Sequence, residues 1–496
     1  MNQKFLQQQK IEFGDFQTPQ ELTDSIVQLV KTQQNNLKSI IEPSCGTGNF
    51  IISCLSYLSE VDHIIGAEIN QKYLDSLNLK INTIEINTKI HLIKNNFFII
   101  NWSNLIKNLL EPILIIGNPP WVTNSKLGSF KSSNLPSKNN FQNKKGLDAI
   151  TGKSNFDISE WMILQYLEWL HNKNGVIAVL CKTSVARKIL IHVWSNKLHI
   201  LETKIYSVNA LKYFAVSVDA CLLIIKTSKN YQKRILQKCL VYPTLLAQQP
   251  INVIGFKDNF LISNLSDFEN LKFLYQSEQN YCWRSGIKHD CAKIMELEKK
   301  NDFYYNGYSV QLDLEDLYIY PLLKSSDLNN NFIDSSRKNI LVTQHYPKQD
   351  TTLISKNAPK TWNYLQENII HFLNRKSSIY KNSPNFSIFG IGDYSFAPWK
   401  VAISGFYKSL KFRKIGSLQN KPVIFDDTVY FLPCYSESEA IFLCEILNSD
   451  LAQKFLESMI FWNDKRPITV NLLKRLSLSY LARELKREEE YLCYTK

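Results

Sequence analysis

The 496-residue sequence lacks any apolar run long enough to cross a membrane. A transmembrane helix needs about 20 consecutive apolar residues. The longest runs here, Pro112–Ile116 and Val176–Cys181, are far shorter and are typical of buried strands. The N-terminal stretch also lacks the apolar core and cleavage site of a secretory signal. These absences argue against a membrane protein and predict a cytoplasmic one.

Paired cysteines are absent as well. The ten cysteines are scattered, and no two have the Cys-X-X-Cys spacing of a metal or redox motif. Cys282 and Cys291 flank His289, but three potential ligands without such a pair are a poor match to a zinc site. We therefore expect free thiols in a reducing compartment, and no metal.

Charge of one sign is in modest excess. Lys and Arg outnumber Asp and Glu by 58 to 45, which gives a net charge of +13. A basic surplus favours a polyanionic partner, with nucleic acid ahead of an anionic membrane. A solvated, lysine-rich surface would give the same number, so charge alone leaves both interpretations open. The length, with 44% hydrophobic residues, is sufficient for two to four globular domains.

The first half alternates short β-rich runs with helical stretches. This pattern predicts an α/β fold with a mostly parallel sheet and helices on both faces. The seven expected strands are Ser39–Pro43, His63–Ile69, Ile90–Lys94, Ile113–Gly117, Gly175–Cys181, Ile200–Ser207 and Ala220–Thr227. The expected helices lie near Glu21–Lys31, Asn49–Leu58, Lys72–Asn78 and Ile158–His171.

The alternation degrades near Lys226–Gln249 into a basic, polar segment. We place a domain boundary there, which gives domains 1–245 and 246–496. The second half mixes aromatic strand-like runs and turn residues with helices expected over Glu437–Ile460 and Asn471–Tyr491. It is expected to be an α+β domain.

The stretch from Val122 to Asn155 does not fit the helix–strand rhythm. It contains one acidic residue, Asp148, and six lysines, which are Lys126, Lys131, Lys138, Lys144, Lys145 and Lys153. A loop this long inside a compact domain is usually functional or disordered. Contact with phosphates and a solvated insertion are equally compatible with it.

The sharpest local motif is Ile41-Glu-Pro-Ser-Cys-Gly-Thr-Gly-Asn-Phe50, in which an apolar strand ends in an acid and Gly46 and Gly48 form a turn into a helix. Glycines allow close approach of a ligand, and a helix N-terminus offers unpaired N–H groups. The spacing is neither a dinucleotide fingerprint nor a P-loop. The next strand ends in Glu68, which is placed to accept hydrogen bonds from ribose hydroxyls. Together the two motifs favour an adenosine-containing cofactor, although either alone is compatible with an ordinary strand–helix turn.

The fourth strand ends in Asn118-Pro-Pro-Trp121. Consecutive prolines stop the strand, stiffen the backbone and leave their carbonyls as acceptors. The side-chain carbonyl of Asn118 and the carbonyl of Pro119 could converge on one amino group, beside the aromatic ring of Trp121. A strand terminator with an aromatic neighbour would be the alternative if the motif stood alone.

The order of these features resembles that of the gamma class of N6-adenine DNA methyltransferases. These are the TaqI-type enzymes of restriction–modification systems. The features are the glycine turn, the acid that ends the second strand, the Asn-Pro-Pro-aromatic motif and the long C-terminal extension. The resemblance covers most of the chain. The further motifs that carry it are Gly14–Pro19, Lys153–Trp161, Gly175–Thr183, Phe214–Asp219, Tyr320–Asp327 and Ile446–Ser449 through Arg475-Leu476.

The resemblance implies a Rossmann-like class I methyltransferase domain of seven strands, followed by a DNA target-recognition domain. It implies S-adenosylmethionine as cofactor, bound by Thr18, Glu42, Ser44, Gly46, Gly48, Glu68, Ile69, Asn96, Phe97 and Asn118. It further implies a catalytic set of Asn118, Pro119, Pro120, Trp121 and Phe214, in which the rings of Trp121 and Phe214 sandwich a flipped adenine. The chain departs from the family in carrying Asn96 where Asp is usual and Trp121 where Tyr or Phe is more common.

Duplex DNA is the expected partner. We expect contacts from Lys138, Lys144 and Lys145 in the lysine-rich stretch, from Arg284 and Lys288 beside Trp283, and from Lys465 and Arg466. Surface turns would explain the last two groups nearly as well. The resemblance also implies a monomer in the cytoplasm of a prokaryote, near its nucleoid, with a separate restriction endonuclease as its functional partner.

Other functions share parts of this pattern. An N4-cytosine DNA methyltransferase, an RNA methyltransferase and a glutamine protein methyltransferase can all use Asn-Pro-Pro-aromatic. The long basic second half argues against a compact protein-modifying enzyme. A non-catalytic DNA-binding subunit is a further alternative, against which the intact Glu42, Glu68 and Asn118–Trp121 argue.

Overall fold

The computed structural model describes residues 16–85, 87–122, 157–230, 237–278, 280–301, 303–330 and 333–495. The chain divides into two compact units, Met1–Leu265 and Ser266–Lys496. Within the described residues, no helix is both long enough and apolar enough to cross a membrane.

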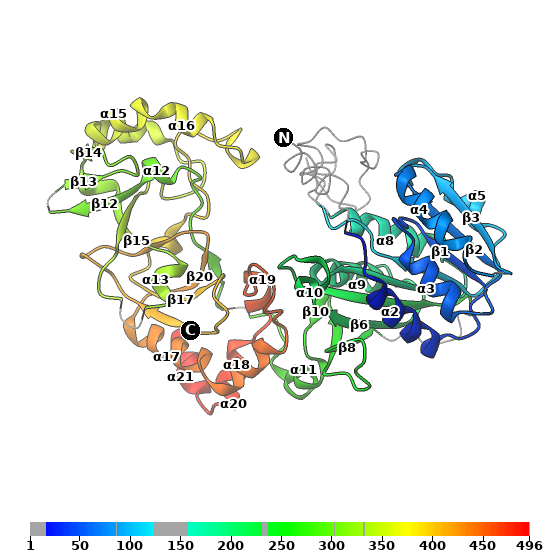
Figure 1. Ribbon diagram of the computed structural model, residues 1–496. Helices are drawn as coiled ribbons and strands as arrows, with labels where there is room; N and C mark the ends of the chain where they lie inside the picture. The colour runs from blue at the N-terminus through cyan, green and yellow to red at the C-terminus, as the bar shows by residue number, and fades with distance from the viewer. Residues whose placement is uncertain are drawn as a thin grey trace. The chain divides into compact units, whose positions relative to one another are not determined.

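A ten-stranded sheet forms the centre of the first unit (Figure 1). Seven of its strands follow the order β3-β2-β1-β4-β5-β7-β6 and are parallel except for β7, which is antiparallel to both neighbours. Their bounds are β1 Ser39–Glu42, β2 His63–Glu68, β3 Lys89–Lys94, β4 Ile113–Gly117, β5 Gly175–Lys182, β6 Ile200–Val208 and β7 Ala220–Thr227. These are the seven strands that the sequence pattern predicts.

Three further strands extend the sheet beyond β6. Strand β8 (Lys238–Tyr242) pairs in parallel with β6, and β9 (Asn252–Lys257) and β10 (Phe260–Ile262) follow in antiparallel order. The expected boundary at residue 245 therefore falls inside the sheet, and the first unit continues to Leu265. The boundary was misplaced because β8 follows a polar, basic segment and only Cys239 and Tyr242 of its side chains are buried.

Helices cover both faces of this sheet. Every residue of β1 and β4 is buried, and successive side chains of a strand point to opposite faces, so both faces must be covered. Helix α2 packs against α3, and α8 packs against α9. The helices of this unit are α2 Gln20–Gln33, α3 Asn49–Tyr57, α4 Gln71–Ile81, α5 Trp102–Ile106, α8 Ile158–Trp169, α9 Thr183–Ser195 and α10 Ala210–Phe214, with α11 Leu265–Leu271 at the boundary.

The second unit is an α+β domain built on two sheets of order β11-β20-β17-β18 and β14-β13-β12-β16-β15-β19. The strands are β11 Arg284–Ser285, β12 Glu296–Lys300, β13 Phe303–Tyr305, β14 Gln311–Leu312, β15 Ile319–Leu323, β16 Lys338–Leu341, β17 Trp399–Ser404, β18 Arg413–Ile415, β19 Ile424–Phe425 and β20 Val429–Cys434. Its helices are α12 Ala292–Met295, α13 Ser325–Leu328, α14 Ile354–Asn357, α15 Pro359–Glu367, α16 Ile369–Leu373, α17 Glu437–Leu447, α18 Asp450–Glu457, α19 Val470–Leu473, α20 Leu478–Glu484 and α21 Glu488–Thr495.

The two long helices expected in this unit are broken into shorter ones. The stretch expected over Glu437–Ile460 divides between α17 and α18 at Ser449, whose side chain accepts a hydrogen bond from the N–H of Ala452 and so starts a new helix. Ser477 begins α20 in the same way by accepting from the N–H of Tyr480. Hydrophobic spacing continues across both breaks, which is why the pattern alone joined the segments.

Candidate active site

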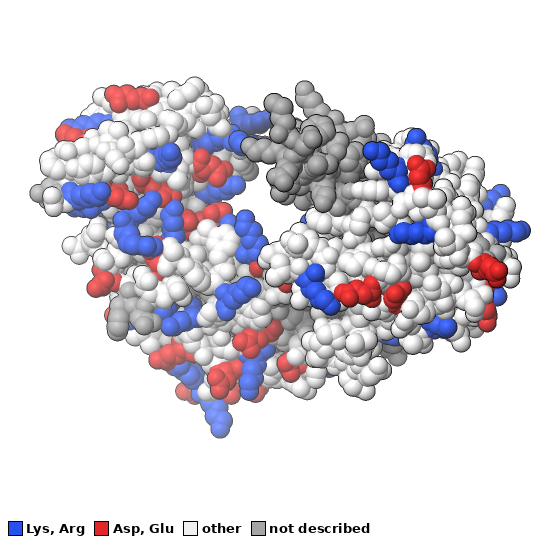
Figure 2. Space-filling view, in the orientation of Figure 1, with Lys and Arg blue, Asp and Glu red and all other residues white. Residues whose placement is uncertain are grey.

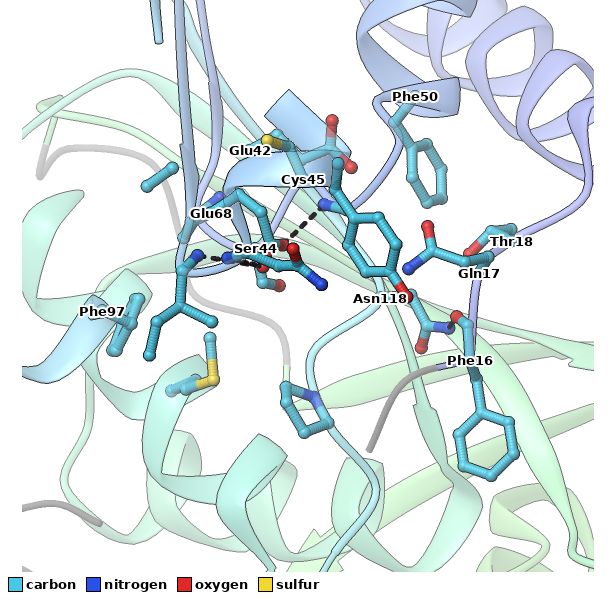
Figure 3. Close-up of a pocket in the computed structure, with 18 of the residues that line it drawn as sticks. Phe16, Gln17, Thr18, Glu42, Ser44, Cys45, Phe50, Glu68, Phe97 and Asn118 are labelled. Atoms are coloured by element: carbon cyan, nitrogen blue, oxygen red, sulfur yellow. Dashed lines mark hydrogen bonds between the residues drawn. The ribbon is translucent and has the colours of Figure 1, made fainter. Parts of the chain in front are cut away.

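The carboxyl ends of β1, β2 and β4 meet at one edge of the sheet, because the three strands are parallel neighbours. Glu42 ends β1, Glu68 ends β2 and Asn118 follows β4. A cavity of about 300 Å³ opens there (Figure 3), at the low end of the range for small-molecule sites. It is lined by Phe16, Gln17, Thr18, Glu42, Pro43, Ser44, Cys45, Gly46, Asn49, Phe50, Ala67, Glu68, Ile69, Asn70, Tyr73, Asn95, Asn96, Phe97, Phe98, Asn118, Pro120, Ile158 and Met162.

The glycine turn has the backbone that the sequence predicts. Gly46 and Gly48 have φ values of +51° and +78°, in the left-handed region that favours glycine. A Cβ on Gly46 would lie 2.4 Å from the side-chain oxygen of Gln17. Gln17 also accepts from the backbone N–H of Thr47 at 3.0 Å. The segment before α2 therefore closes over the turn.

The Glu68 carboxylate ties the turn to the end of β2. One oxygen accepts from the N–H of Gly46 at 2.9 Å, and the other accepts from the N–H groups of Ile69 and Asn70, each at 2.9 Å. The expected contact of Glu68 with ribose hydroxyls stays a prediction.

Glu42 is a buried acid, with only 2% of its surface exposed. Burial raises the pKa of its carboxyl well above the ordinary value; the N–H of Ile51 opposes this shift and the negative charge of Glu68 adds to it. Its Oε2 has no hydrogen-bond partner among the described residues. A cation bound beside Glu42 would stabilise the ionised carboxylate that burial disfavours, so this position on the cavity wall suits a cationic ligand.

Asn118 presents a second unsatisfied acceptor. Its Nδ2 donates to the carbonyl of Phe16 at 3.2 Å (Figure 3), and its Oδ1 is buried with no partner among the described residues. The bond to Phe16 fixes which end of the amide faces that carbonyl, so Oδ1 is left as an acceptor. This is the group expected to receive a hydrogen bond from a target amine.

Three aromatic rings pack beside this segment. The rings of Trp121 and Phe214 are 5.2 Å apart at 71°, and Phe16 lies 6.3 Å from Trp121 and 6.4 Å from Phe214. Trp121 and Phe214 are 7% and 8% exposed. The two rings thus touch edge to face, and a base can stack between them only if they separate. Phe16 lies within the Gly14–Pro19 motif, but the sequence assigned no role to its ring.

The expected adenine end of the cavity is also aromatic. Asn96 caps a short 3-10 helix, Phe97–Ile99, by accepting from the N–H of Phe98 at 3.0 Å. Phe97 packs among the rings of Phe98, Trp102, Trp161, Tyr166 and Trp169. This packing holds the Phe97 ring at the cavity wall, where it offers a flat apolar surface.

The structure brings most of the expected cofactor residues together. Those that line the cavity are Thr18, Glu42, Ser44, Gly46, Glu68, Ile69, Asn96, Phe97 and Asn118, whereas Gly48 does not. Of the other expected catalytic residues, Pro120 lines the cavity, and Pro119, Trp121 and Phe214 do not. The lining residues to which the sequence assigned no role are Phe16, Gln17, Pro43, Cys45, Asn49, Phe50, Ala67, Asn70, Tyr73, Asn95, Phe98, Ile158 and Met162. Most of them lie close in sequence to predicted residues, and that proximity was the available signal. Ile158 lies within the Lys153–Trp161 motif and Met162 directly follows it.

The described residues that are expected to contact DNA each have a different local environment. Arg284 lies over the ring of Tyr394 at 4.4 Å, and Lys288 pairs with Asp290 at 3.5 Å. Arg466 pairs with Asp427 at 3.4 Å, and Lys465 is exposed. Lys138, Lys144 and Lys145 lie outside the described residues. On the face of the second unit in Figure 2, Lys and Arg lie among Asp and Glu rather than in a field of one sign.

The strand order with its reversed β7, the glycine turn after β1 and the acids that end β1 and β2 define a class I methyltransferase, a class of enzymes that uses S-adenosylmethionine. The sequence profile of the N-6 DNA methylase family matches residues 1–252. The chain is also 47% identical over 478 residues to the Type II methyltransferase M.NspV of Nostoc sp. (strain ATCC 29411 / PCC 7524), covering 96% of this chain and 98% of that protein. The chain therefore belongs to the N-6 DNA methylase family.

Two solved structures are more distantly similar. One is the Type IIL restriction–modification enzyme MmeI in complex with DNA, at 15% identity and a TM-score of 0.49, with coverage of 89% of this chain and 62% of that one. The other is TrmK of M. capricolum with S-adenosylhomocysteine, at 14% identity and a TM-score of 0.26, with coverage of 41% and 68%.

Proposed function

We propose that this enzyme methylates the N6 amino group of a flipped-out adenine in a specific duplex DNA sequence, as the modification enzyme of a restriction–modification system. The observation that carries the proposal is the Oδ1 of Asn118, which is buried, has no partner among the described residues and is oriented by the bond from Nδ2 to Phe16. An amine that donates to Asn118 needs such an acceptor. Family membership and the match to M.NspV support DNA as the substrate.

When bound, S-adenosylmethionine supplies a methyl group on a sulfonium; its C–S bond breaks with the electron pair going to sulfur as the C–N bond to the amine forms. The protein's task is to make a weak nucleophile competent, since the lone pair of an exocyclic amine is delocalised into the purine. Hydrogen bonds from the two amine protons to Asn118 Oδ1 and to the Pro119 carbonyl pull the nitrogen toward tetrahedral geometry. Positioning and fixed dipoles then supply most of the catalysis, and the extra proton leaves to solvent.

The residues of the cavity fit this cofactor by their chemistry. The buried carboxylate of Glu42 suits a cationic ligand, the acid Glu68 suits ribose hydroxyls, and Phe97 offers a surface for adenine. We assign Thr18, Ser44, Gly46, Ile69 and Asn96 to the same ligand because they line the same cavity, and Gly48 to the backbone turn that shapes it.

Stacking in a duplex hides the amine, so the base must leave the helix at a cost of a few kcal/mol. We assign Trp121 and Phe214 to the two faces of the flipped base, where aromatic stacking contributes roughly 1–3 kcal/mol per base. The edge-to-face contact between the rings then has to open when a base enters.

We assign catalysis to the first unit and reading of the target sequence to the second, with Arg284, Lys288, Lys465 and Arg466 as candidate contacts. The enzyme is proposed to act as a monomer in the cytoplasm, alongside a separate restriction endonuclease.

The test is to methylate DNA with the purified chain and S-adenosylmethionine, digest the product to nucleosides and identify them by mass spectrometry. The expected product is N6-methyladenine, and methylation-sensitive long-read sequencing of DNA from expressing cells should place it at one recurring sequence. N4-methylcytosine would overturn the adenine assignment while leaving the amine chemistry of Asn118 intact. No methylated nucleoside would overturn the proposed activity.

A further inference from the structure

The carbonyl of Trp121 is held by a side chain from the neighbouring strand. β5 is the parallel neighbour of β4, so Lys182 at the end of β5 reaches the same sheet edge as the Asn118–Trp121 segment. Lys182 Nζ donates to the Trp121 carbonyl at 2.9 Å. The motif is thus fixed at both ends, at Asn118 by Phe16 and at Trp121 by Lys182.

Lys182 is in turn paired with Asp157. Nζ lies 2.6 Å from Asp157 Oδ2, and the two side chains are 24% and 7% exposed. The other oxygen of Asp157 caps α8 by accepting from the N–H of Ser159 at 3.2 Å and from its hydroxyl at 2.6 Å. Ile158 and Met162 of that helix line the cavity. The ion pair therefore joins the catalytic segment to a helix that forms the cavity wall.

The charge of this pair matters as well as its position. As the methyl group arrives, positive charge develops on the acceptor nitrogen. An unpaired ammonium bonded to the Asn118–Trp121 segment would repel the positive charge that develops on this nitrogen. A partly buried site screens such repulsion poorly. The carboxylate of Asp157 cancels the ammonium, so Lys182 can hold the Trp121 carbonyl without opposing the reaction.

We propose that Lys182 is a positioning residue for methyl transfer and that the carboxylate of Asp157 offsets the positive charge of its ammonium. The inference rests on the proposed function, because it takes the Asn118–Trp121 segment as the seat of the reacting base. It adds to the site a residue pair that belongs neither to the cofactor set nor to the catalytic set.

The test compares Lys182→Met, Lys182→Arg, Asp157→Asn and the double variant with the wild-type enzyme. The single-turnover rate of methyl transfer, the cofactor Kd and the fluorescence of 2-aminopurine at the target position are measured for each. Lys188→Met is the matched control, because Lys188 of α9 pairs with Glu160 of α8 at 2.7 Å. Among the described residues, Lys188 forms no hydrogen bond or ion pair with the Asn118–Trp121 segment.

Lys182→Met should slow transfer roughly tenfold to hundredfold, the range of a small misplacement of reacting groups, with the cofactor Kd unchanged. Lys182→Arg should recover most of the rate. Asp157→Asn should be slower than Lys182→Met because it leaves the ammonium unpaired, and the double variant should return to the Lys182→Met rate. The 2-aminopurine emission should fall in Lys182→Met and stay at the wild-type level in Lys188→Met.

A wild-type rate in Lys182→Met would overturn the inference, as would an equal loss in Lys188→Met, which would show that anchoring of α8 is all that matters. Both of these outcomes can be distinguished from a failure of the proposed function. If the wild-type product is N4-methylcytosine, the same rates still test Lys182. If the wild type transfers no methyl group, the proposed function fails and the inference falls with it, whereas an active wild type with an equally active Lys182→Met overturns the inference alone.

Discussion

The Glu68 carboxylate accepts a hydrogen bond from the backbone N–H of Gly46 at 2.9 Å, so the acid that ends β2 holds the glycine turn that follows β1. The shape of the turn therefore depends on the side chain that we also propose to bind the cofactor. Parallel pairing of β1 with β2 makes this possible, because it brings Glu42 and Glu68 to the same sheet edge.

Glu68→Ala should weaken S-adenosylmethionine binding by roughly 1–3 kcal/mol, since two ribose hydroxyls and several backbone N–H groups lose an acceptor. Calorimetric titration measures the loss, and Glu68→Gln, which keeps one acceptor oxygen, should lose less. An analogue that lacks a ribose hydroxyl separates the two causes. The wild type should discriminate against the analogue, and Glu68→Ala should not. Equal discrimination by both proteins would remove Glu68 from the ribose site.

Asn118→Ala should lower the rate of methyl transfer by at least about a hundredfold while changing the cofactor Kd by no more than about threefold, because Asn118 acts mainly in the transition state. Incorporation of tritium from labelled cofactor into DNA measures the rate, and titration gives the Kd. Substantial turnover in a folded variant would contradict the assigned role.

The sequence predicted the parts of the site that lie at strand ends. Glu42, Glu68 and Asn118 each follow an apolar run, and parallel strands bring such ends together without further information. The cavity also depends on Phe16 and Gln17, which contact the turn and Asn118 from a segment before the first strand. Lys182 ends an ordinary buried strand, and only the packing of β5 against β4 shows what its ammonium reaches.

The second unit was predicted only as far as its class. Its strands are short and its cores join residues far apart in the chain, such as Ile287 with Ile424, so no local period marks the sheets. The breaks at Ser449 and Ser477 depend on single capping side chains within continuous hydrophobic spacing. The end of the first unit was misplaced for a related reason, since β9 and β10 lie beyond a segment whose composition resembles a linker.

A buried ion cluster should stabilise the second unit in a pH-dependent way. Burial opposes ionisation of Glu296, but hydrogen bonds from His289 and Lys324, together with Lys338, outweigh it and lower its pKa to about 2. The pKa of Glu296 in the folded protein lies below its ordinary value of 4.5, so the stabilisation is complete above about pH 4.5 and is lost as the pH falls toward 2.

Glu296→Gln should therefore lower the Tm at pH 7, and the Tm difference from wild type should stay constant down to about pH 5 and narrow below pH 4.5. Thermal unfolding followed by circular dichroism measures this. Glu298→Gln is the matched control on the same strand, because Glu298 is exposed and pairs only weakly with Lys300 at 3.5 Å. A Tm difference for Glu296→Gln that does not change with pH would contradict the ionic role of the cluster.

The lysine-rich stretch that follows Trp121 offers a test of phosphate contact that needs no knowledge of the target sequence. If Lys138, Lys144 and Lys145 each neutralise a phosphate, each releases about 0.9 counterion on duplex DNA, so replacing all three should flatten the slope of log affinity against log salt by up to about three units. Sequence preference should not change, because phosphate contacts position a protein whereas base edges specify the site.

Fluorescence anisotropy over a salt series measures the slope. A matched replacement of the exposed Lys89, Lys107 and Lys238 removes the same charge elsewhere on the first unit and should leave the slope nearly unchanged. Equal slopes for wild type and the Lys138, Lys144 and Lys145 variant would identify the stretch as a solvated insertion.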